Sequence, residues 1–153
     1  MNIALLLAGG SGVRTEQDVP KQFLNVYEKP IILYTLEAFQ KHPDINGIIV
    51  SCLDGWHEIL RVYAQDAGIT KLQKIVNGGE NGQASARNAL RELKEICQED
   101  DIVIIHDAIR PMVSADIISD CIEKCRRYGS GLAAMRCQET IIKTDDGVKG
   151  NEG

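Results

Sequence analysis

The sequence predicts a single α/β domain, built on a mostly parallel, twisted sheet with helices on both faces. Two observations support this prediction. Short, uninterrupted apolar runs alternate with segments of about a dozen residues in which apolar positions recur at helical spacing. The chain of 153 residues is also about the length of one domain, without an internal repeat, a low-complexity tract or a linker. We therefore expect residues 1–153 to form one domain.

The predicted strands are apolar runs that end at turn-forming residues. The first, residues 3–8 (IALLLA), stops at a glycine-rich turn and has the continuous apolar pattern of a strand buried on both faces. Further strands are predicted over residues 47–52, 72–76, 102–105 and 131–135.

The predicted helices lie between these strands. Pro30 opens the first, in which apolar residues recur at helical spacing, and Pro43 ends it. Amphipathic patterns predict further helices over residues 56–67, 86–96 and 117–128. Strands joined through helices imply parallel βαβ units with right-handed crossovers.

Composition and charge narrow the functional classes. Apolar residues make up 44% of the chain and charged residues 25%, as in ordinary soluble proteins, and no apolar run approaches the roughly 20 residues that span a bilayer. A net charge of −5 argues against nonspecific nucleic-acid binding, which needs a basic excess.

Five scattered cysteines without a CxxC pair fit reduced thiols in a cytoplasmic protein. Cys121 and Cys125 lie one helical turn apart, as metal ligands sometimes do, but they also continue an apolar stripe, so we favour core packing.

Three loops that follow predicted strands carry the candidate chemistry, because open parallel sheets bind ligands beyond the carboxyl ends of their strands. The first reads LAGGSGVR from Leu7 to Arg14 and is followed by Pro20-Lys21-Gln22. Glycines let backbone N–H groups approach phosphates, and Arg14 and Lys21 can neutralise their charge. The string matches neither GxGxxG nor GxxxxGK[ST], so from the residues alone a tight turn with unrelated surface cations is the alternative.

The second loop, residues 77–85 (NGGENGQAS), lies between a predicted strand and a predicted helix. It offers backbone donors and short polar side chains, which suit the edge of a nucleic base. The alternative is that Ser85 is merely an exposed residue in the first turns of a helix.

The third loop, residues 106–111 (HDAIRP), follows the strand predicted at 102–105. An aspartate at the carboxyl end of a strand can bind a ribose hydroxyl or help to hold Mg²⁺, and Arg110 can bind phosphate or brace Asp107. An ordinary salt bridge between these two side chains is the alternative.

The three loops together resemble the signature of the nucleotidyltransferases that make CDP-linked polyols. In that family the first loop follows the pattern [LA]AGxGxRM…PKQ[FY], where this chain has LAGGSGVR…PKQF, with Thr15 at the methionine. The second follows GGxxRxxS, with Gly82 here at the arginine, and the third follows HDA[AV]RP. The matches keep the family's order and spacing over residues 3–143. Two groups share them: 2-C-methyl-D-erythritol 4-phosphate cytidylyltransferase of isoprenoid biosynthesis and D-ribitol 5-phosphate cytidylyltransferase of cell-wall and capsule polymers.

The resemblance implies a Rossmann-like nucleotidyltransferase fold and transfer of CMP from CTP to a polyol phosphate, with pyrophosphate as the second product, Mg²⁺ as cofactor and a homodimer as the assembly. It assigns Arg14 and Lys21 as the catalytic charge stabilisers, and Arg110 and Thr140 as contacts of the acceptor. The implied CTP site comprises Ala8, Gly9, Gly10, Ser11, Gly12, Gly79, Glu80, Ser85 and Asp107. We give His106 a structural role, because an acceptor that is already a phosphate dianion needs little base chemistry.

Family members are longer than this chain, and we expect it to lack their carboxyl-terminal third. A catalytically silent nucleotide-binding or interaction module is therefore an alternative. Another is a nucleotidyltransferase with a different sugar-phosphate acceptor, which would use UTP or dTTP. The LAGG string and the β-branched Ile109 lean toward ribitol 5-phosphate, while methylerythritol phosphate stays open as the acceptor.

Overall fold

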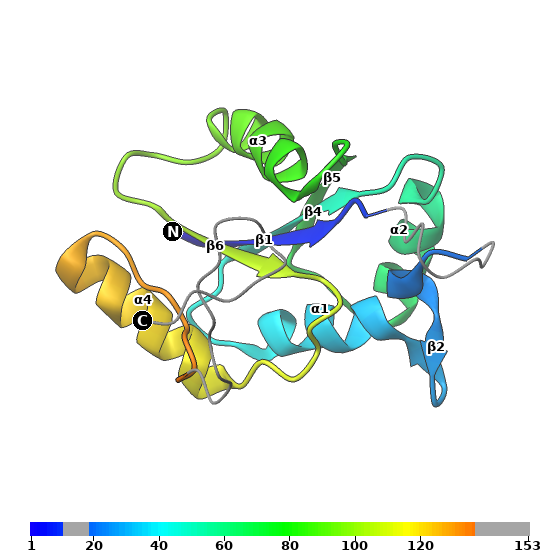
Figure 1. Ribbon diagram of the computed structural model, residues 1–153, viewed down its shortest axis with the longest axis horizontal. Helices are drawn as coiled ribbons and strands as arrows, with labels where there is room; N and C mark the ends of the chain where they lie inside the picture. Colours follow the sequence, from blue (N-terminus) through cyan, green and yellow to red (C-terminus); the bar gives the residue numbers. More distant parts are fainter. Residues whose placement is uncertain (11–18, 137–153) are drawn as a thin grey trace, which may run out of the picture.

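The computed structural model describes residues 1–10 and 19–136. Its centre is a four-stranded parallel sheet in the order β5-β4-β1-β6 (Figure 1). The strands are β1 (Asn2–Ala8), β4 (Gly47–Cys52), β5 (Leu72–Asn77) and β6 (Ile102–Asp107). The helices are α1 (Ile31–Lys41), α2 (His57–Asp66), α3 (Gly82–Leu93) and α4 (Ala115–Tyr128). The predicted parallel α/β architecture is confirmed.

Helices cover both faces of the sheet, as predicted (Figure 1). On one face Ala4 and Leu6 of β1 pack into a cluster with side chains of α1, α2 and α4. On the other face Ile3 and Leu5 pack against α3. All four side chains are fully buried, because successive residues of a strand point to opposite faces and both faces are covered.

The helix predicted over residues 86–96 begins earlier, at Gly82. Asn81 caps it, since the side-chain oxygen of Asn81 accepts a hydrogen bond from the Ala84 N–H at 2.9 Å. The cap draws the polar residues 82–85 into the first turn, where apolar periodicity gives no signal.

The prediction of a strand over residues 131–135 is wrong. These residues have no regular secondary structure, and the side chains of Leu132 and Met135 are 90% and 91% exposed. Gly129, at φ 84°, ends α4 in the left-handed conformation, and Gly131 then contacts the Cys121 carbonyl of the same helix. Residues 131–136 therefore turn back along α4 instead of pairing with β6 (Figure 1). An apolar run forms a strand only where a sheet edge is within reach.

The described residues that precede α1, from residue 19 onward, form short elements that the sequence does not predict. A single 3₁₀ turn, η1 (Lys21–Phe23), is followed by a small hairpin of β2 (Asn25–Val26) and β3 (Lys29–Pro30). The Tyr34 hydroxyl of α1 donates to the Val26 carbonyl at 2.8 Å, and Lys29 pairs with Glu37. These contacts fix the hairpin on α1.

All four strands of the main sheet run in the same direction, so their carboxyl ends share one edge. Ala8 is in register with Cys52, Cys52 with Asn77, and Leu7 with Asp107. The loops that follow β1, β5 and β6 therefore begin at the same edge of the sheet, with β4 between β1 and β5. Within residues 1–10 and 19–136, no helix is long and apolar enough to cross a membrane.

Candidate active site

The loops after β1 and β5 touch each other through glycine backbone. A side chain placed on Gly9 would bring its Cβ within 2.7 Å of the Ser85 hydroxyl and 3.0 Å of the Gly78 Cα. A Cβ on Gly78 would meet the Gly9 Cα at 2.8 Å. Only glycine allows this approach. The glycine-rich turn after β1, which suits phosphates, and the loop 77–85, which suits the edge of a base and is called here the base-type loop, therefore form one site.

Ser85 organises the loop after β5. Its hydroxyl accepts a hydrogen bond from the Gly79 N–H at 2.9 Å, and the residue is only 2% exposed. Gly79 lies so close to Ala84 that a side chain there would overlap the helix. The alternative that Ser85 is an exposed surface residue is wrong. Glu80 is exposed at the tip of the same loop, where its carboxylate can meet a ligand.

Gln22 is a site residue whose role the sequence analysis missed. It is 1% exposed, and its side-chain Nε2 donates to the Ala8 carbonyl at 2.8 Å and to the Gly10 carbonyl at 3.2 Å. Its neighbour Phe23 stacks on Trp56 with ring centroids 4.6 Å apart. Lys21, the predicted catalytic cation, is exposed at the start of the same 3₁₀ turn. In the sequence, only the PKQF string could have indicated this arrangement. A single polar glutamine does not by itself predict a buried side chain.

The loop after β6 holds Asp107 and Arg110 together. The Arg110 Nε donates to Oδ2 of Asp107 at 2.7 Å, with the two side chains 73% and 48% exposed. The salt bridge considered in the sequence analysis is therefore present. At such exposure it contributes about 0–1 kcal/mol, so either side chain can exchange its partner for a ligand at little cost.

The same loop is anchored by contacts to β1 and α1 and by a bond within the loop. The Ala108 N–H donates to the Leu7 carbonyl at 3.0 Å, and Thr35 of α1 donates through Oγ1 to the Ala108 carbonyl at 2.7 Å. The His106 ring bonds to the Arg110 carbonyl at 2.9 Å and packs at 5.3 Å from the Phe39 ring. These are the contacts of a residue that shapes the loop, in line with the structural role predicted for His106.

The structure thus brings together Ala8, Gly9, Gly10, Gly79 and Ser85, with Lys21 attached through Gln22 and Asp107 in register beside β1. The predicted site residues Ser11, Gly12, Arg14 and Thr140 lie outside the described residues.

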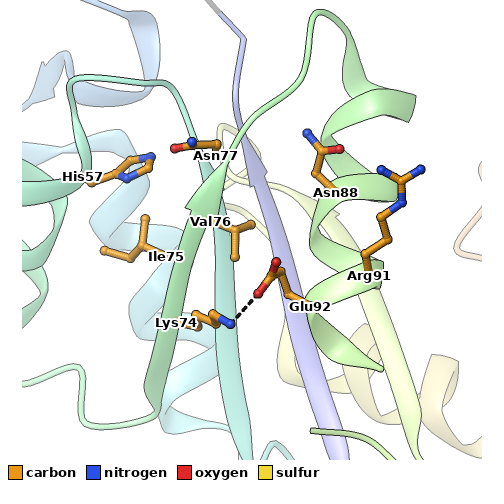
Figure 2. Close-up of a pocket in the computed structure, with 8 residues that line it drawn as sticks. All are labelled: His57, Lys74, Ile75, Val76, Asn77, Asn88, Arg91 and Glu92. Carbon is orange, nitrogen blue, oxygen red and sulfur yellow. Dashed lines mark hydrogen bonds and ion pairs between the residues drawn. The ribbon is translucent and has the colours of Figure 1, made fainter. Parts of the chain in front are cut away.

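A shallow groove of about 440 Å³ runs along the outer edge of β5, and its lining includes Asn77, the first residue of the loop 77–85 (Figure 2). Within it Lys74 of β5 pairs with Glu92 of α3, and this bond raises the pKa of the lysine above its usual value. Asn88 donates through Nδ2 to the Gly78 carbonyl at 3.4 Å. These contacts fasten α3 to β5 and so hold the loop between them.

Metal ligands are sparse in the described part of the chain. No group of three His, Cys, Asp or Glu side chains there could hold an ion, and Cys121 and Cys125 are unpaired and partly exposed. Asp107, the last residue of β6, is the carboxylate that the sequence analysis considered for Mg²⁺. Mg²⁺ usually binds through one or two carboxylates together with substrate phosphates, so a single aspartate fits that ion and not a metal held by protein alone.

The parallel sheet, the glycine turn after β1 and the loops beside it define a protein with a nucleotidyltransferase fold. The chain belongs to the 2-C-methyl-D-erythritol 4-phosphate cytidylyltransferase (IspD) family, whose model matches residues 2–151.

Curated relatives carry two names. The chain is 45% identical over 142 residues to a ribitol-5-phosphate cytidylyltransferase of Lacticaseibacillus paracasei, covering 93% of this chain and 61% of that one. It is 35% identical over 147 residues to a 2-C-methyl-D-erythritol 4-phosphate cytidylyltransferase of Clostridium botulinum, covering 95% and 63%. The chain therefore spans less than two thirds of the length of these relatives.

A solved structure shares the fold. The 4-diphosphocytidyl-2C-methyl-D-erythritol synthase of Anaerococcus prevotii superposes with a TM-score of 0.75 at 19% identity, covering 98% of this chain and 61% of that one. At that identity the similarity concerns the fold alone.

Proposed function

We propose that this chain forms the nucleotide-binding part of a cytidylyltransferase, which transfers CMP from CTP to a polyol phosphate and releases pyrophosphate. The observation that carries the proposal is the contact of Gly9 with Gly78 and Ser85, which joins the glycine turn to the base-type loop. The family membership and the names of the relatives support the same chemistry.

In this reaction an oxygen of the acceptor phosphate attacks the α-phosphorus of CTP. A new P–O bond forms as the bond to the bridging oxygen of the pyrophosphate breaks, and the leaving group takes the electron pair. Lys21 and Arg14 stabilise the negative charge that develops on the equatorial oxygens and the leaving group. Bound Mg²⁺ supplies further charge neutralisation of the triphosphate, and Asp107 is the residue here that would hold it.

Recognition of the base is assigned to the loop after β5. The Glu80 carboxylate is an acceptor and suits the exocyclic amino group of cytosine, where uracil has a carbonyl oxygen. The Ser85 hydroxyl already accepts from Gly79 and keeps its own hydrogen to donate to an acceptor of the base. This pairing favours CTP over UTP.

Ribitol 5-phosphate is the proposed acceptor, with Arg110 and Thr140 as its contacts. The higher identity to the ribitol-5-phosphate relative supports this choice over the methylerythritol one. Methylerythritol 4-phosphate is the second candidate, because the family model carries that name. We further propose that the protein acts in the cytoplasm as a homodimer.

The test is pyrophosphate release by the longest natural form of the chain with CTP and Mg²⁺, with each acceptor in parallel and UTP as the control nucleotide. Release with ribitol 5-phosphate and CTP is expected. Pyrophosphate release only with methylerythritol 4-phosphate would identify that compound as the acceptor in place of ribitol 5-phosphate. CTP binding without pyrophosphate release would favour a silent nucleotide-binding module.

The role of Lys21 has its own test. Lys21→Ala should lower turnover by about a hundredfold or more, while changing the Kd for CTP much less, because its charge is used mainly in the transition state. Equal losses in turnover and binding would contradict the assignment.

A further inference from the structure

Gln22 joins two parts of the candidate site that are separate in the sequence. Its buried amide lies between the turn after β1 and the 3₁₀ turn that carries Lys21. We propose that Gln22 is a positioning residue: it holds the Ala8–Gly10 turn, and with it Lys21, in the arrangement that binds the nucleotide triphosphate. The inference rests on the proposed function for the identity of the ligand.

The first step of the argument is the direction of the peptide groups. The Nε2 of Gln22 bonds the carbonyls of Ala8 and Gly10, so both oxygens point toward this side chain. In a trans peptide the C=O and N–H bonds point in opposite directions, and the structure contains no cis peptide among its described residues. The Gly9 N–H therefore points away from Gln22.

The second step concerns charge. Phosphate oxygens are attracted by backbone N–H groups and repelled by carbonyl oxygens. By binding two carbonyls, Gln22 keeps acceptors off the face that a phosphate would approach. Around Gly10 no residue of the ranges 1–10 and 19–136 lies within 4 Å of where a Cβ would be, so these residues leave that side of the turn open.

The third step links the turn to Lys21. Successive side chains of a 3₁₀ helix point about 120° apart, because the helix has three residues per turn. Gln22 and Phe23 are both buried, the latter against Trp56, so the direction of the Lys21 side chain is fixed outward. One amide therefore sets the place of both the backbone donors and the catalytic cation.

The fourth step is that the fold of β1 does not depend on this amide alone. The Ala8 carbonyl also accepts from the Leu53 N–H at 3.2 Å. Loss of the Gln22 amide would leave that bond in place and free the Gly10 carbonyl to turn. We thus expect a loosened site on a folded protein.

The experiment compares Gln22→Met with a matched control, Asn2→Leu. Methionine keeps the length of the side chain and removes both donor hydrogens. Asn2 is also a buried amide, 5% exposed, whose Nδ2 donates to the Asp44 carbonyl at 2.7 Å, but at the opposite end of β1. Both variants should lose stability in urea unfolding.

Calorimetric titration with CTP and Mg²⁺ separates positioning from stability. Gln22→Met should weaken CTP binding about tenfold or more and lower turnover further, while Asn2→Leu should bind CTP within about twofold of the unmodified protein. A Gln22→Met protein that binds CTP as the unmodified protein does would overturn the inference.

A second readout does not need the nucleotide. The amide NMR signals of Gly9 and Gly10 should shift in Gln22→Met and stay unchanged in Asn2→Leu. If Gln22→Met does not fold, Gln22→Asn decides, because its amide is one methylene too short to reach both carbonyls. If the unmodified protein binds no CTP, the proposed function fails. The amide signals of Gly9 and Gly10 still test the positioning role in that case, because unshifted signals in Gln22→Met would contradict it.

Discussion

At the residue scale, two buried serines show how context decides what a hydroxyl does. Ser85 is 2% exposed and accepts a hydrogen bond from the Gly79 N–H. Ser51, in the middle of the sheet, is 0% exposed, and its Oγ is the buried side-chain oxygen for which the described residues provide no partner. A buried polar group without a partner costs about 1–3 kcal/mol, whereas a bonded one is roughly neutral to favourable.

We therefore expect Ser51→Ala and Ser85→Ala to act in opposite directions. Ser51→Ala should raise the free energy of unfolding by about 1 kcal/mol, and Ser85→Ala should lower it by about 1 kcal/mol. Only the second should weaken CTP binding. Urea unfolding and calorimetric titration measure the two effects, and similar losses of stability in both variants would show that Ser51 has a partner.

At the element scale, the site depends on how closely the loops after β1 and β5 approach. Gly9 and Gly78 meet backbone to backbone, and the Gly78 N–H also donates to the Cys52 carbonyl at 2.7 Å. Three neighbouring strands, β1, β4 and β5, are thus connected beyond their ends. Helix α3 is held over this junction by its Asn81 cap and by the Lys74–Glu92 pair.

Gly78→Ala should destabilise the protein by about 1–3 kcal/mol. The new Cβ would lie 2.8 Å from the Gly9 Cα and 3.1 Å from the Cys52 carbonyl, and backbone atoms cannot yield as a flexible side chain can. Gly10→Ala is the control: among the described residues none lies within 4 Å of its Cβ position, so the free energy of unfolding of this variant should change by less than about 0.5 kcal/mol. Thermal and urea unfolding of both variants test the contrast.

At the scale of the whole molecule, the core imposes a pH dependence through Cys52. This residue is 0% exposed, and burial raises the pKa of its thiol from the usual 9.0 to about 11, against a smaller lowering by a backbone hydrogen bond at Leu53. Between these two values the folded protein keeps a proton that the unfolded chain has lost. The stabilisation is present below about pH 9 and disappears as the pH rises toward 11.

The free energy of unfolding should accordingly fall as the pH rises through this window, by at most about 1.4 kcal/mol per pH unit from this thiol. Burial also raises the pKa of the Cys97 thiol, which contributes in the same direction. Comparison with Cys52→Ala isolates the first thiol: urea unfolding from pH 8 to 11 should show a shallower decline in the variant. An unchanged slope would contradict the assignment to Cys52.

Local sequence determined the parts of the fold that depend on local patterns. The run IALLLA predicted β1, and periodic apolar residues predicted the helices. Burial of one or both faces of an element requires apolar residues at a regular spacing, which can be recognised in the sequence. The order of strands and helices then predicted a parallel sheet with helices on both faces. The glycine-rich, base-type and HDAIRP loops were found because each follows a strand.

Only the tertiary structure decided which of these features meet. The strand predicted at residues 131–135 failed because the chain folds back on α4, and no local pattern records which sheet edge is within reach. The burial of Ser85, the contact of Gly9 with Gly78 and the two bonds of Gln22 depend on residues up to about seventy positions apart in the chain. Sequence patterns report the environment of a residue along its own element, whereas these contacts form between elements, so they appear only when the sheet brings the strand ends together.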